Sequence, residues 1–312
     1  RRRQRQMCIR DRSQVAPTMQ YTGQYYRALL KNILQGNLQI PMWDMSIGFG
    51  MNILQVISFD PVYILCSVLF VHDIAVGIAI FDMLCLYLAG IMFIALCYNL
   101  GCNRYAALAA ALAYIFNGYI LNYCIAQNSF LRLFIVLPMI LLGVYNVTKK
   151  NRYGIFVLAV LYNITLGPLN IYTIGIVLIF CFCMAYIFSD RKKGVADFFS
   201  YIWKPVLIYI LEMLVMAVFL IPTMYKVVSG GRIGNASINF QWLYDVSYYR
   251  SLFHGLVGVD EIGIHGYIGV TTIAILAVVC LVIKGNKSLL EKELCVCGVA
   301  ACLLYTSPSP RD

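Results

Sequence analysis

Two carboxylates between residues 13 and 73 have neighbours that suggest chemistry. Asp44 follows Trp43 in the stretch IPMWDMSIGFGMN, and Asp60 precedes Pro61 in ISFDPVYIL. An indole ring can stack on the apolar face of a sugar while a nearby carboxylate binds hydroxyl groups or removes a proton. The sequence therefore predicts a sugar-binding Trp43, with Asp44 and Asp60 as candidate catalytic residues.

Both acids also have a purely structural interpretation. Trp43 is a residue type that anchors loops at a membrane surface, and Asp44 can cap the turn that follows it. Asp60 stands immediately before a proline and an apolar stretch, which is typical of a helix N-cap. For Asp60 the capping interpretation is favoured, and for Asp44 the two interpretations are almost balanced.

A second group of candidates carries charge within or near apolar segments. Asp82 and Glu212 fall inside expected spans, and Arg132 lies near the outer end of another. Charged side chains are costly inside a bilayer and are therefore functional candidates by default. Of the three, Glu212 is expected to lie deepest, near the cytoplasmic third of its span.

The stretch 226–266 contributes two arginines, Arg232 and Arg250, among tyrosines, phenylalanines and Trp242. Arginine binds acidic or phosphorylated partners through paired hydrogen bonds, although aromatic residues at a membrane surface explain much of the same pattern. The three histidines of the chain are widely separated, so neither a metal site nor a cofactor is predicted.

All these residues need a membrane scaffold to position them. Hydrophobic residues make up 61% of the chain and the mean hydropathy is +0.77, which indicates an integral membrane protein. About 20 apolar residues are needed to cross a bilayer core of roughly 30 Å. We therefore predict an all-α, polytopic transmembrane bundle of about seven complete spans, with the start of another near residue 294. The complete spans are expected at residues 74–99, 105–123, 129–148, 153–166, 169–188, 205–225 and 267–283.

The block from 153 to 188 is long for one span and short for two. Its centre, YNITLGPLN, contains Gly167 and Pro168, which interrupt helices, so a helical hairpin is expected. Two crossings also let the Lys and Arg residues of the short loops collect on one side, as they do in cytoplasmic loops. This orientation leaves two extracytoplasmic segments, 13–73 and 226–266.

The two ends of the chain are expected to be foreign to the protein. A common transposase sequencing adapter, when translated, encodes residues 2–11, RRQRQMCIRD. Its partner adapter encodes residues 302–312, CLLYTSPSPRD. We therefore set 1–12 and 302–312 aside. The rest is expected to consist of the first extracytoplasmic loop, 13–73, and the transmembrane helical domain, 74–301. This lowers the formal net charge from +10 to +5, because the ends contain seven of the 24 Lys and Arg residues and two of the 14 Asp and Glu residues. The remaining charges form short separate clusters, so no nucleic-acid partner is predicted.

Several loop residues follow one ordered pattern. The pattern ends with Asp60 and Pro61, and its middle part is WDMSIGFG at 43–50. Its early members are Gln14, Pro17, Tyr21, Gly23, Tyr25 and Arg27. In this pattern the chain, from Gln14 to about Ile283, resembles the YfhO-like family of bacterial membrane proteins, which is similar to the GT-C class of polytopic glycosyltransferases.

The resemblance implies an enzyme on the outer face of the bacterial plasma membrane, in contact with membrane lipids. It implies transfer of a sugar from a polyprenyl-phosphate donor to a cell-envelope polymer or lipid acceptor. Gln14, Tyr21 and Trp43 are then expected to bind the substrate. Arg232 or Arg250 is expected to neutralise the phosphate of the carrier.

The same pattern places a leading aspartate at position 10, where this chain has Arg10. The resemblance implies that this aspartate is the catalytic base, so we expect the intact protein to be active and this fragment to be inactive. A transporter or lipid flippase is the main alternative, because a broken hairpin at Gly167 and a buried Glu212 suit a midplane binding site. A noncatalytic envelope-assembly partner is the third possibility.

Overall fold

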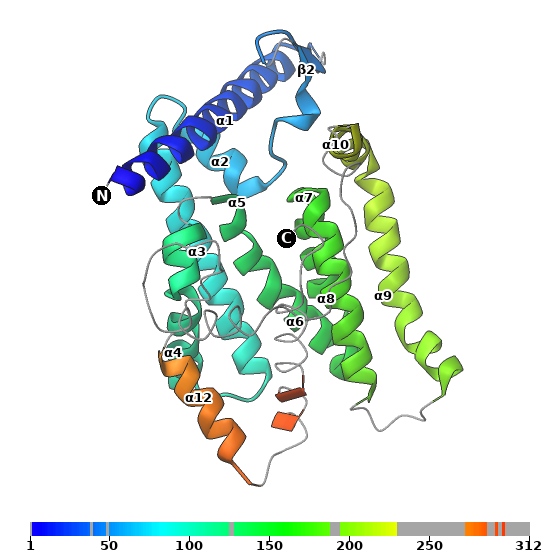
Figure 1. Cartoon of the computed structure of the whole chain (residues 1–312). Helices are drawn as coiled ribbons and strands as arrows, with labels where there is room; N and C mark the ends of the chain where they lie inside the picture. Colours follow the sequence, from blue (N-terminus) through cyan, green and yellow to red (C-terminus); the bar gives the residue numbers. More distant parts are fainter. Residues whose placement is uncertain are drawn as a thin grey trace.

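The computed structural model describes residues 2–37, 40–47, 50–124, 128–187, 194–229, 272–285, 291–292 and 295–296. Within them the protein is a bundle of helices that stand side by side, with one long helix lying across an end of the bundle (Figure 1). We call this the outer end, because the predicted orientation places it outside the cytoplasm. The all-α prediction is confirmed, and the only β-structure in the described part is one pair of two-residue strands.

The outer end is covered by a layer that we call the outer cap. It consists of α1 (Arg2–Leu34), β1 (Trp43–Asp44), β2 (Met51–Asn52), the short 3-10 helix η1 (Ile53–Gln55) and α2 (Pro61–Leu69). The α1 helix includes the residues that the sequence assigns to an adapter. It also shows that much of the first outer segment is helical and not an irregular loop.

Gly23 lets α1 lie directly against α2. A methyl group at this position would lie 2.1 Å from the carbonyl oxygen of Ser67, far inside the distance at which atoms repel one another. Glycine is the residue that permits such a close approach of two backbones. Another face of α1 packs against the segment after β2, where Tyr25, Ile53, Leu54 and Ile57 are buried together.

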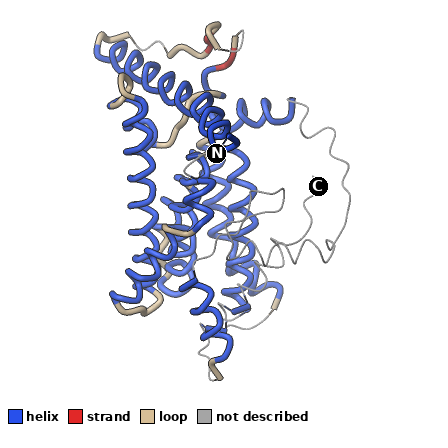
Figure 2. The backbone as a smooth tube through the Cα atoms, turned by 60° about the vertical axis from the view of Figure 1, so that its left-hand side comes forward, coloured by secondary structure: helices blue, strands red, loops and turns tan. Residues whose placement is uncertain are grey.

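The remaining described helices form the bundle itself, which Figure 2 shows from a second direction. They are α3 (Ile74–Asn99), α4 (Arg104–Ile115), the π-helical turn η2 (Ile120–Cys124), α5 (Asn128–Leu131), α6 (Leu133–Lys150), α7 (Gly154–Thr165), α8 (Pro168–Ile187), α9 (Val195–Val215), α10 (Ala217–Ser229) and α12 (Thr272–Ile283).

Three of the described helices are long and apolar enough to cross a membrane: Ile74–Asn99, Leu133–Lys150 and Asp197–Val215. Shorter apolar helices lie at Arg104–Ile115, Gly154–Thr165, Val177–Ile187 and Ala274–Ile283. These segments confirm a polytopic membrane protein, while the predicted number of spans stays a prediction. The expected span at 105–123 is interrupted, because α4 ends at Ile115 and the π-helical turn follows.

Local sequence sets several helix ends. The side chain of Asn103 accepts a hydrogen bond from the first turn of α4, and Asn151 ends α6 in the left-handed conformation with φ +52°. Gly167, with φ +113°, separates α7 from α8, which begins at Pro168. The hairpin expected in this block is therefore confirmed as two separate helices.

Helix α6 is the centre of the packing. One buried apolar cluster joins it to α7 and α8, and another joins it to α2, α3 and α5. At Gly143 the contact with α7 is very close, since an added methyl group would lie 2.8 Å from the Cα atom of Phe156. Close backbone approach at small residues is a common way for helices to pack within membranes.

The span expected at residues 205–225 is wrong. Helix α9 begins well before it and carries Pro205 in its interior, and α10 turns away from the axis of α9 at Met216 (Figure 1). The apolar run was counted from Pro205, but the helix begins upstream and its flanking turns maintain it around the proline. As a result Glu212 lies about one turn from the outer end of α9 and not near the cytoplasmic third.

The basic residues of the short turns lie together at the far end of the bundle. The α3–α4 and α6–α7 turns are opposite the outer cap (Figure 1), and they are flanked by Arg104, Lys149, Lys150 and Arg152. This arrangement is the one that the predicted orientation requires. The orientation itself stays a prediction.

Candidate functional site

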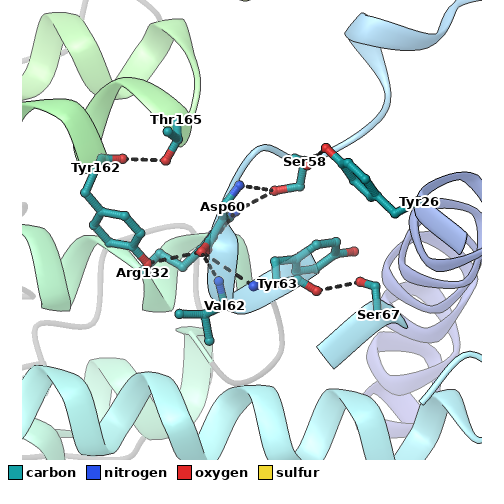
Figure 3. Close-up of polar contacts among 9 residues, drawn as sticks. All are labelled: Tyr26, Ser58, Asp60, Val62, Tyr63, Ser67, Arg132, Tyr162 and Thr165. Carbon is teal, nitrogen blue, oxygen red and sulfur yellow. Dashed lines mark hydrogen bonds and ion pairs between the residues drawn. The ribbon is translucent and has the colours of Figure 1, made fainter. Parts of the chain in front are cut away.

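Asp60 directly precedes α2 and caps its first turn (Figure 3). Its Oδ1 atom accepts hydrogen bonds from the backbone nitrogens of Val62, at 2.9 Å, and Tyr63, at 3.5 Å. The backbone nitrogen of Asp60 donates to Oγ of Ser58 over 3.3 Å. The N-cap interpretation of Asp60 is therefore confirmed.

The same carboxylate also joins the outer cap to the bundle. Its Oδ2 atom lies 3.4 Å from Nη1 of Arg132, and the hydroxyl of Tyr162 donates to Oδ1 over 3.4 Å (Figure 3). Arg132 precedes α6 and Tyr162 belongs to α7, so three distant parts of the sequence meet at Asp60. The Asp60 side chain is 0% exposed and that of Arg132 is 12% exposed. Solvent therefore screens this ion pair only weakly.

Arg132 makes two further contacts with the outer cap. Its Nη1 atom donates to Oγ of Ser58 over 3.3 Å, and its guanidinium carbon lies 5.7 Å from the centre of the Tyr63 ring. Burial raises the pKa of Tyr63 to about 12, so its hydroxyl stays protonated. The environment of Arg132 is thus mostly neutral, with Asp60 as its counter-charge.

Buried polar atoms without partners lie close in sequence to this pair. Within the described residues, Nε of Arg132, Nδ2 of Asn128 and both polar side-chain atoms of Asn163 have no hydrogen-bond partner. Asn128 precedes Arg132 by about one helical turn, and Asn163 follows Tyr162 directly. These groups make the outer end of the bundle unusually polar for a membrane interior. Their burial is costly because they lack hydrogen-bond partners.

The other end of α2 is held by Arg27 of α1. Its Nε atom donates to the carbonyl oxygen of Val68 over 2.8 Å, and its Nη2 atom to that of Leu69 over 3.5 Å. Nη1 of Arg27 also lies 3.2 Å from Nε2 of His72. A cation at a helix C-terminus satisfies the last carbonyl groups and complements the helix dipole. Helix α2 is therefore fixed at both ends, by Asp60 and by Arg27.

Asp44 lies on the small hairpin that β1 and β2 form. Its Oδ1 atom accepts hydrogen bonds from the backbone nitrogen of Ser46, at 2.8 Å, and from its hydroxyl, at 2.7 Å. Its Oδ2 atom accepts one of 2.8 Å from the hydroxyl of Tyr21. The structure thus brings together two residues that the sequence predicted for the site, Asp44 and Tyr21.

The protonation of this pair follows from its hydrogen bonds. The bonds from Ser46, and then the bond from Tyr21, hold the pKa of Asp44 below its ordinary value. Partial burial, and then the contact with Asp44, raise the pKa of Tyr21 above its ordinary value. The proton therefore stays on the tyrosine and Asp44 is ionised near neutral pH. A carboxylate of lowered pKa is a weak base, so this arrangement suits binding of hydroxyl groups better than removal of a proton.

Trp43 directly precedes Asp44 on β1. The residue is 59% exposed, and its Nε1 atom lies 3.4 Å from the sulfur of Met45. Gly50, with φ +109°, lets the chain pass the ring, because a methyl group there would lie 3.1 Å from Nε1 of Trp43. An exposed indole and an ionised carboxylate on consecutive residues are the combination that was expected for sugar binding.

The other predicted site residues are placed as follows. No contact joins Asp44 to Asp60 within the described residues, so the two candidate acids belong to different parts of the outer cap. Gln14 lies in α1. Arg232 and Arg250 lie outside the residues that the structure describes. The catalytic role proposed for either acid stays a prediction.

Sequence reasoning missed the pairing of Arg132 with Asp60 and the part that Tyr162 plays in it. One signal was present, because a basic residue at the end of an apolar span needs a counter-charge. No local pattern indicated Tyr162, since its contact depends on how the α7–α8 hairpin packs against the outer cap.

The described residues contain no group of three or more His, Cys, Asp or Glu side chains that could hold a metal ion. Asp82 has one buried oxygen and Glu212 two that lack partners in that part of the chain. Single carboxylates of this kind are candidates for binding a proton or a cation only together with further ligands.

A protein-family profile described as "Bacterial membrane protein YfhO" matches residues 18–295. The match extends from α1 of the outer cap through the helical bundle. No curated protein and no solved structure matches the chain.

Proposed function

We propose that this chain, which belongs to the YfhO family of bacterial membrane proteins, carries the sugar-binding part of an outer-face glycosyltransferase. The donor is a sugar attached to polyprenyl phosphate, and the acceptor is a polymer or lipid of the cell envelope. The membrane is the bacterial plasma membrane. Family membership supports the membrane setting, and the chemistry rests on the outer cap.

The observation that carries the proposal is the group formed by Trp43, Asp44 and Tyr21. The indole is largely exposed, and the carboxylate of the next residue is oriented by Ser46 and Tyr21. A sugar ring has apolar faces that stack on indole and hydroxyl groups that donate to a carboxylate. The fixed carboxylate loses little conformational freedom when the sugar binds.

The outer cap holds this group at a defined place above the bundle. Asp60 joins the cap to Arg132 and Tyr162, and Gly23 allows α1, which carries Tyr21, to lie on α2. In this proposal Trp43 and Asp44 bind the sugar and Asp60 is a positioning residue. Neutralisation of the departing phosphate is assigned to Arg232 or Arg250.

A transporter or flippase is the second candidate, and the unpaired carboxylate of Glu212 is the observation in its favour. The break between α7 and α8 at Gly167 argues against a transporter. Transporters with broken helices place the break near the midplane, whereas Tyr162, close to the Gly167 turn, reaches the outer cap through Asp60. A noncatalytic assembly partner is the third candidate. In that case the affinity for the carrier should not depend on the sugar.

The test is a binding titration of the purified chain in lipid nanodiscs. Polyprenyl phosphate is added with and without an attached hexose or N-acetylhexosamine, and the bound fraction is measured by native mass spectrometry. We expect the attached sugar to increase the affinity for the carrier. Trp43→Ala should lower the affinity for the sugar-bearing carrier about three- to tenfold, which corresponds to the energy of aromatic contacts. Ile40→Ala is the matched control, because Ile40 is 58% exposed in the same loop. Equal affinity for both carriers would contradict the proposal and favour the transporter or assembly alternatives.

A further inference from the structure

The guanidinium group of Arg132 has one edge that the described part of the protein does not use. Its hydrogen bonds to Asp60 and Ser58 are both made by Nη1 (Figure 3). Nε is buried without a hydrogen-bond partner, and Nη2 makes no hydrogen bond to a described residue. Nε and Nη2 lie along one side of the planar group, where they can donate two parallel hydrogen bonds. Such a pair of donors fits two oxygens of one acidic group.

The amide of Asn128 adds another donor on the same helical face. Asn128 lies four residues before Arg132, and the residues between them belong to α5. Arg132 itself has helical backbone angles of φ −63° and ψ −29°. Side chains four residues apart on a helix lie on one face, about a turn apart. Asn128 is 5% exposed, and its Nδ2 atom is buried without a partner.

The acceptors around Arg132 are already engaged. Oδ1 of Asp60 accepts from two backbone amides of α2 and from Tyr162, and Oδ2 accepts from Arg132. Oγ of Ser58 accepts from Arg132 and from the backbone of Asp60. The buried atoms that remain without a partner on the Asn128 and Arg132 side chains, Nδ2 and Nε, are both donors. The partner that this face lacks is therefore an acceptor.

The local charge favours an acceptor that is negatively charged. Asp60 offsets the charge of Arg132 only in part, because its carboxylate also caps the N-terminus of α2, which carries roughly half a positive elementary charge. The ion pair is also long, at 3.4 Å between Nη1 and Oδ2, compared with about 2.7–2.9 Å for a close charge-assisted hydrogen bond. No other acidic side chain of the described residues pairs with Arg132. Positive charge is thus left over at the unused edge.

The position of Arg132 along the bundle matches the depth of a lipid phosphate. Arg132 directly precedes α6, which is long and apolar enough to cross a membrane. Lipid head groups begin where the hydrocarbon core of the bilayer ends. The Arg132 side chain is 12% exposed, so the protein does not seal it completely. A lipid can therefore bring its phosphate to this arginine without leaving its own depth in the bilayer.

We propose that the unused edge of Arg132 and the amide of Asn128 bind the phosphate group of a membrane lipid at the outer end of the bundle. The paired donors of the arginine meet two phosphate oxygens, and Nδ2 of Asn128 meets an oxygen of the same group. Asp60 orients the guanidinium group through Nη1. The phosphate site does not depend on sugar transfer, whereas identification of the lipid as a polyprenyl carrier rests on the proposed function.

The test measures how much a phosphate group contributes to lipid binding. The purified chain, in a maltoside detergent that contains no phosphate, is titrated with polyprenyl phosphate and with the matching polyprenol by native mass spectrometry. The ratio of the two affinities is the phosphate contribution. Arg132→Lys keeps a positive charge opposite Asp60 but removes the paired donors, so we expect the ratio to fall about tenfold. Asn128→Ala leaves the ion pair intact and should lower the ratio about threefold.

Lys31→Gln is the matched control, because Lys31 is an exposed cation of α1 in the same outer cap. It should leave the ratio unchanged, and size-exclusion chromatography shows whether each variant is folded. Phosphatidylglycerol and inorganic phosphate are then added as competitors. Displacement of polyprenyl phosphate by phosphatidylglycerol supports the lipid-phosphate site and identifies a bulk phospholipid as a second occupant. Displacement by inorganic phosphate alone overturns the assignment to a lipid.

The outcomes separate this inference from the proposed function. An unchanged ratio in folded Arg132→Lys and Asn128→Ala overturns the inference and leaves water as the partner of the buried donors. Equal affinity of the parent for polyprenyl phosphate and polyprenol also overturns it. If both variants lower the ratio while an attached sugar adds no affinity in the parent, the phosphate site stands and the glycosyltransferase proposal fails.

Discussion

Asp60 and Asp44 lie in the same outer cap, and their surroundings are opposite. Asp60 is 0% exposed and accepts hydrogen bonds from two backbone amides and from Tyr162, with Arg132 as its counter-charge. Asp44 is partly exposed, and its partners are Ser46 and Tyr21. The difference shows that a fully buried carboxylate positions other groups, whereas a partly exposed one that adjoins an exposed indole in the sequence can meet a ligand.

The energetics of the two regions differ for the same reason. Removing one member of a buried ion pair leaves the other charge desolvated and unpaired, which is strongly destabilising. An exposed carboxylate loses only contacts that water can replace. We therefore expect variants around Asp60 to change stability and variants around Asp44 to change binding.

The largest effect is expected for Asp60→Ala. This change removes the N-cap of α2 and the counter-charge of Arg132, so the free energy of unfolding should fall by about 3–5 kcal/mol. The measurement is thermal unfolding in detergent followed by size-exclusion chromatography. A combined Asp60→Ala and Arg132→Met variant should recover part of the loss, because it also removes the unpaired charge. A single variant as stable as its parent would show that Asp60 does not hold the outer cap to the bundle.

Gly23→Ala is expected to have the next largest effect and to disturb both regions at once. The added methyl group meets the carbonyl oxygen of Ser67, so α1 must move away from α2 at a cost of about 1–3 kcal/mol. The same unfolding assay measures the loss. Gly154→Ala is the control, because a methyl group there meets nothing within 4 Å. Equal stability of the two variants would contradict the close α1–α2 contact.

Arg27→Gln tests the far end of α2 and should cost less. It removes the charge that complements the C-terminus of the helix, which is worth about 1 kcal/mol. Hydrogen exchange of the α2 amides should increase in this variant. Lys31→Gln, one turn further along α1, should leave that exchange unchanged, and a similar increase in both variants would argue against a specific role of Arg27.

Tyr21→Phe should have the smallest effect, and the effect should depend on pH. Since the pKa of Asp44 is lowered in the folded protein, its hydrogen bonds stabilise the hairpin fully above the ordinary carboxyl pKa of about 4. That stabilisation is lost as the pH falls through the lower folded value. The difference between variant and parent should thus be present at neutral pH and shrink in acid. It can be followed by Trp43 fluorescence in a background with Trp203→Phe and Trp242→Phe, and a difference that persists in acid would exclude the ionised Asp44 as its cause.

Much of the fold could be predicted because its signals are local. Apolar runs predicted the bundle, and Gly167 followed by Pro168 predicted the hairpin correctly. The position of Asp60 before Pro61 predicted its capping role. Each of these features depends on a few consecutive residues and on the length of an apolar segment.

The features that could not be predicted depend on packing between distant segments. The apolar run at 205–225 predicted one span, yet α9 begins at Val195, continues through Pro205 and places Glu212 near its outer end. The partners of Asp60 come from α7 and from the residue before α6. For the candidate site, the sequence identified Trp43 and Asp44 but could not distinguish the exposed acid from the buried one. Burial is a property of the assembled cap and not of either short motif.

The most direct test of this division is a crossed comparison of Asp44→Asn and Asp60→Asn in two assays, thermal unfolding and affinity for sugar-bearing polyprenyl phosphate. We expect Asp44→Asn to retain the stability of the parent and to lose sugar-dependent affinity. We expect Asp60→Asn to be clearly less stable, while the protein that remains folded still distinguishes the carrier with sugar from the bare carrier. Loss of sugar discrimination in a stable Asp60→Asn variant, with normal discrimination in Asp44→Asn, would contradict the account and move the sugar site to the buried acid.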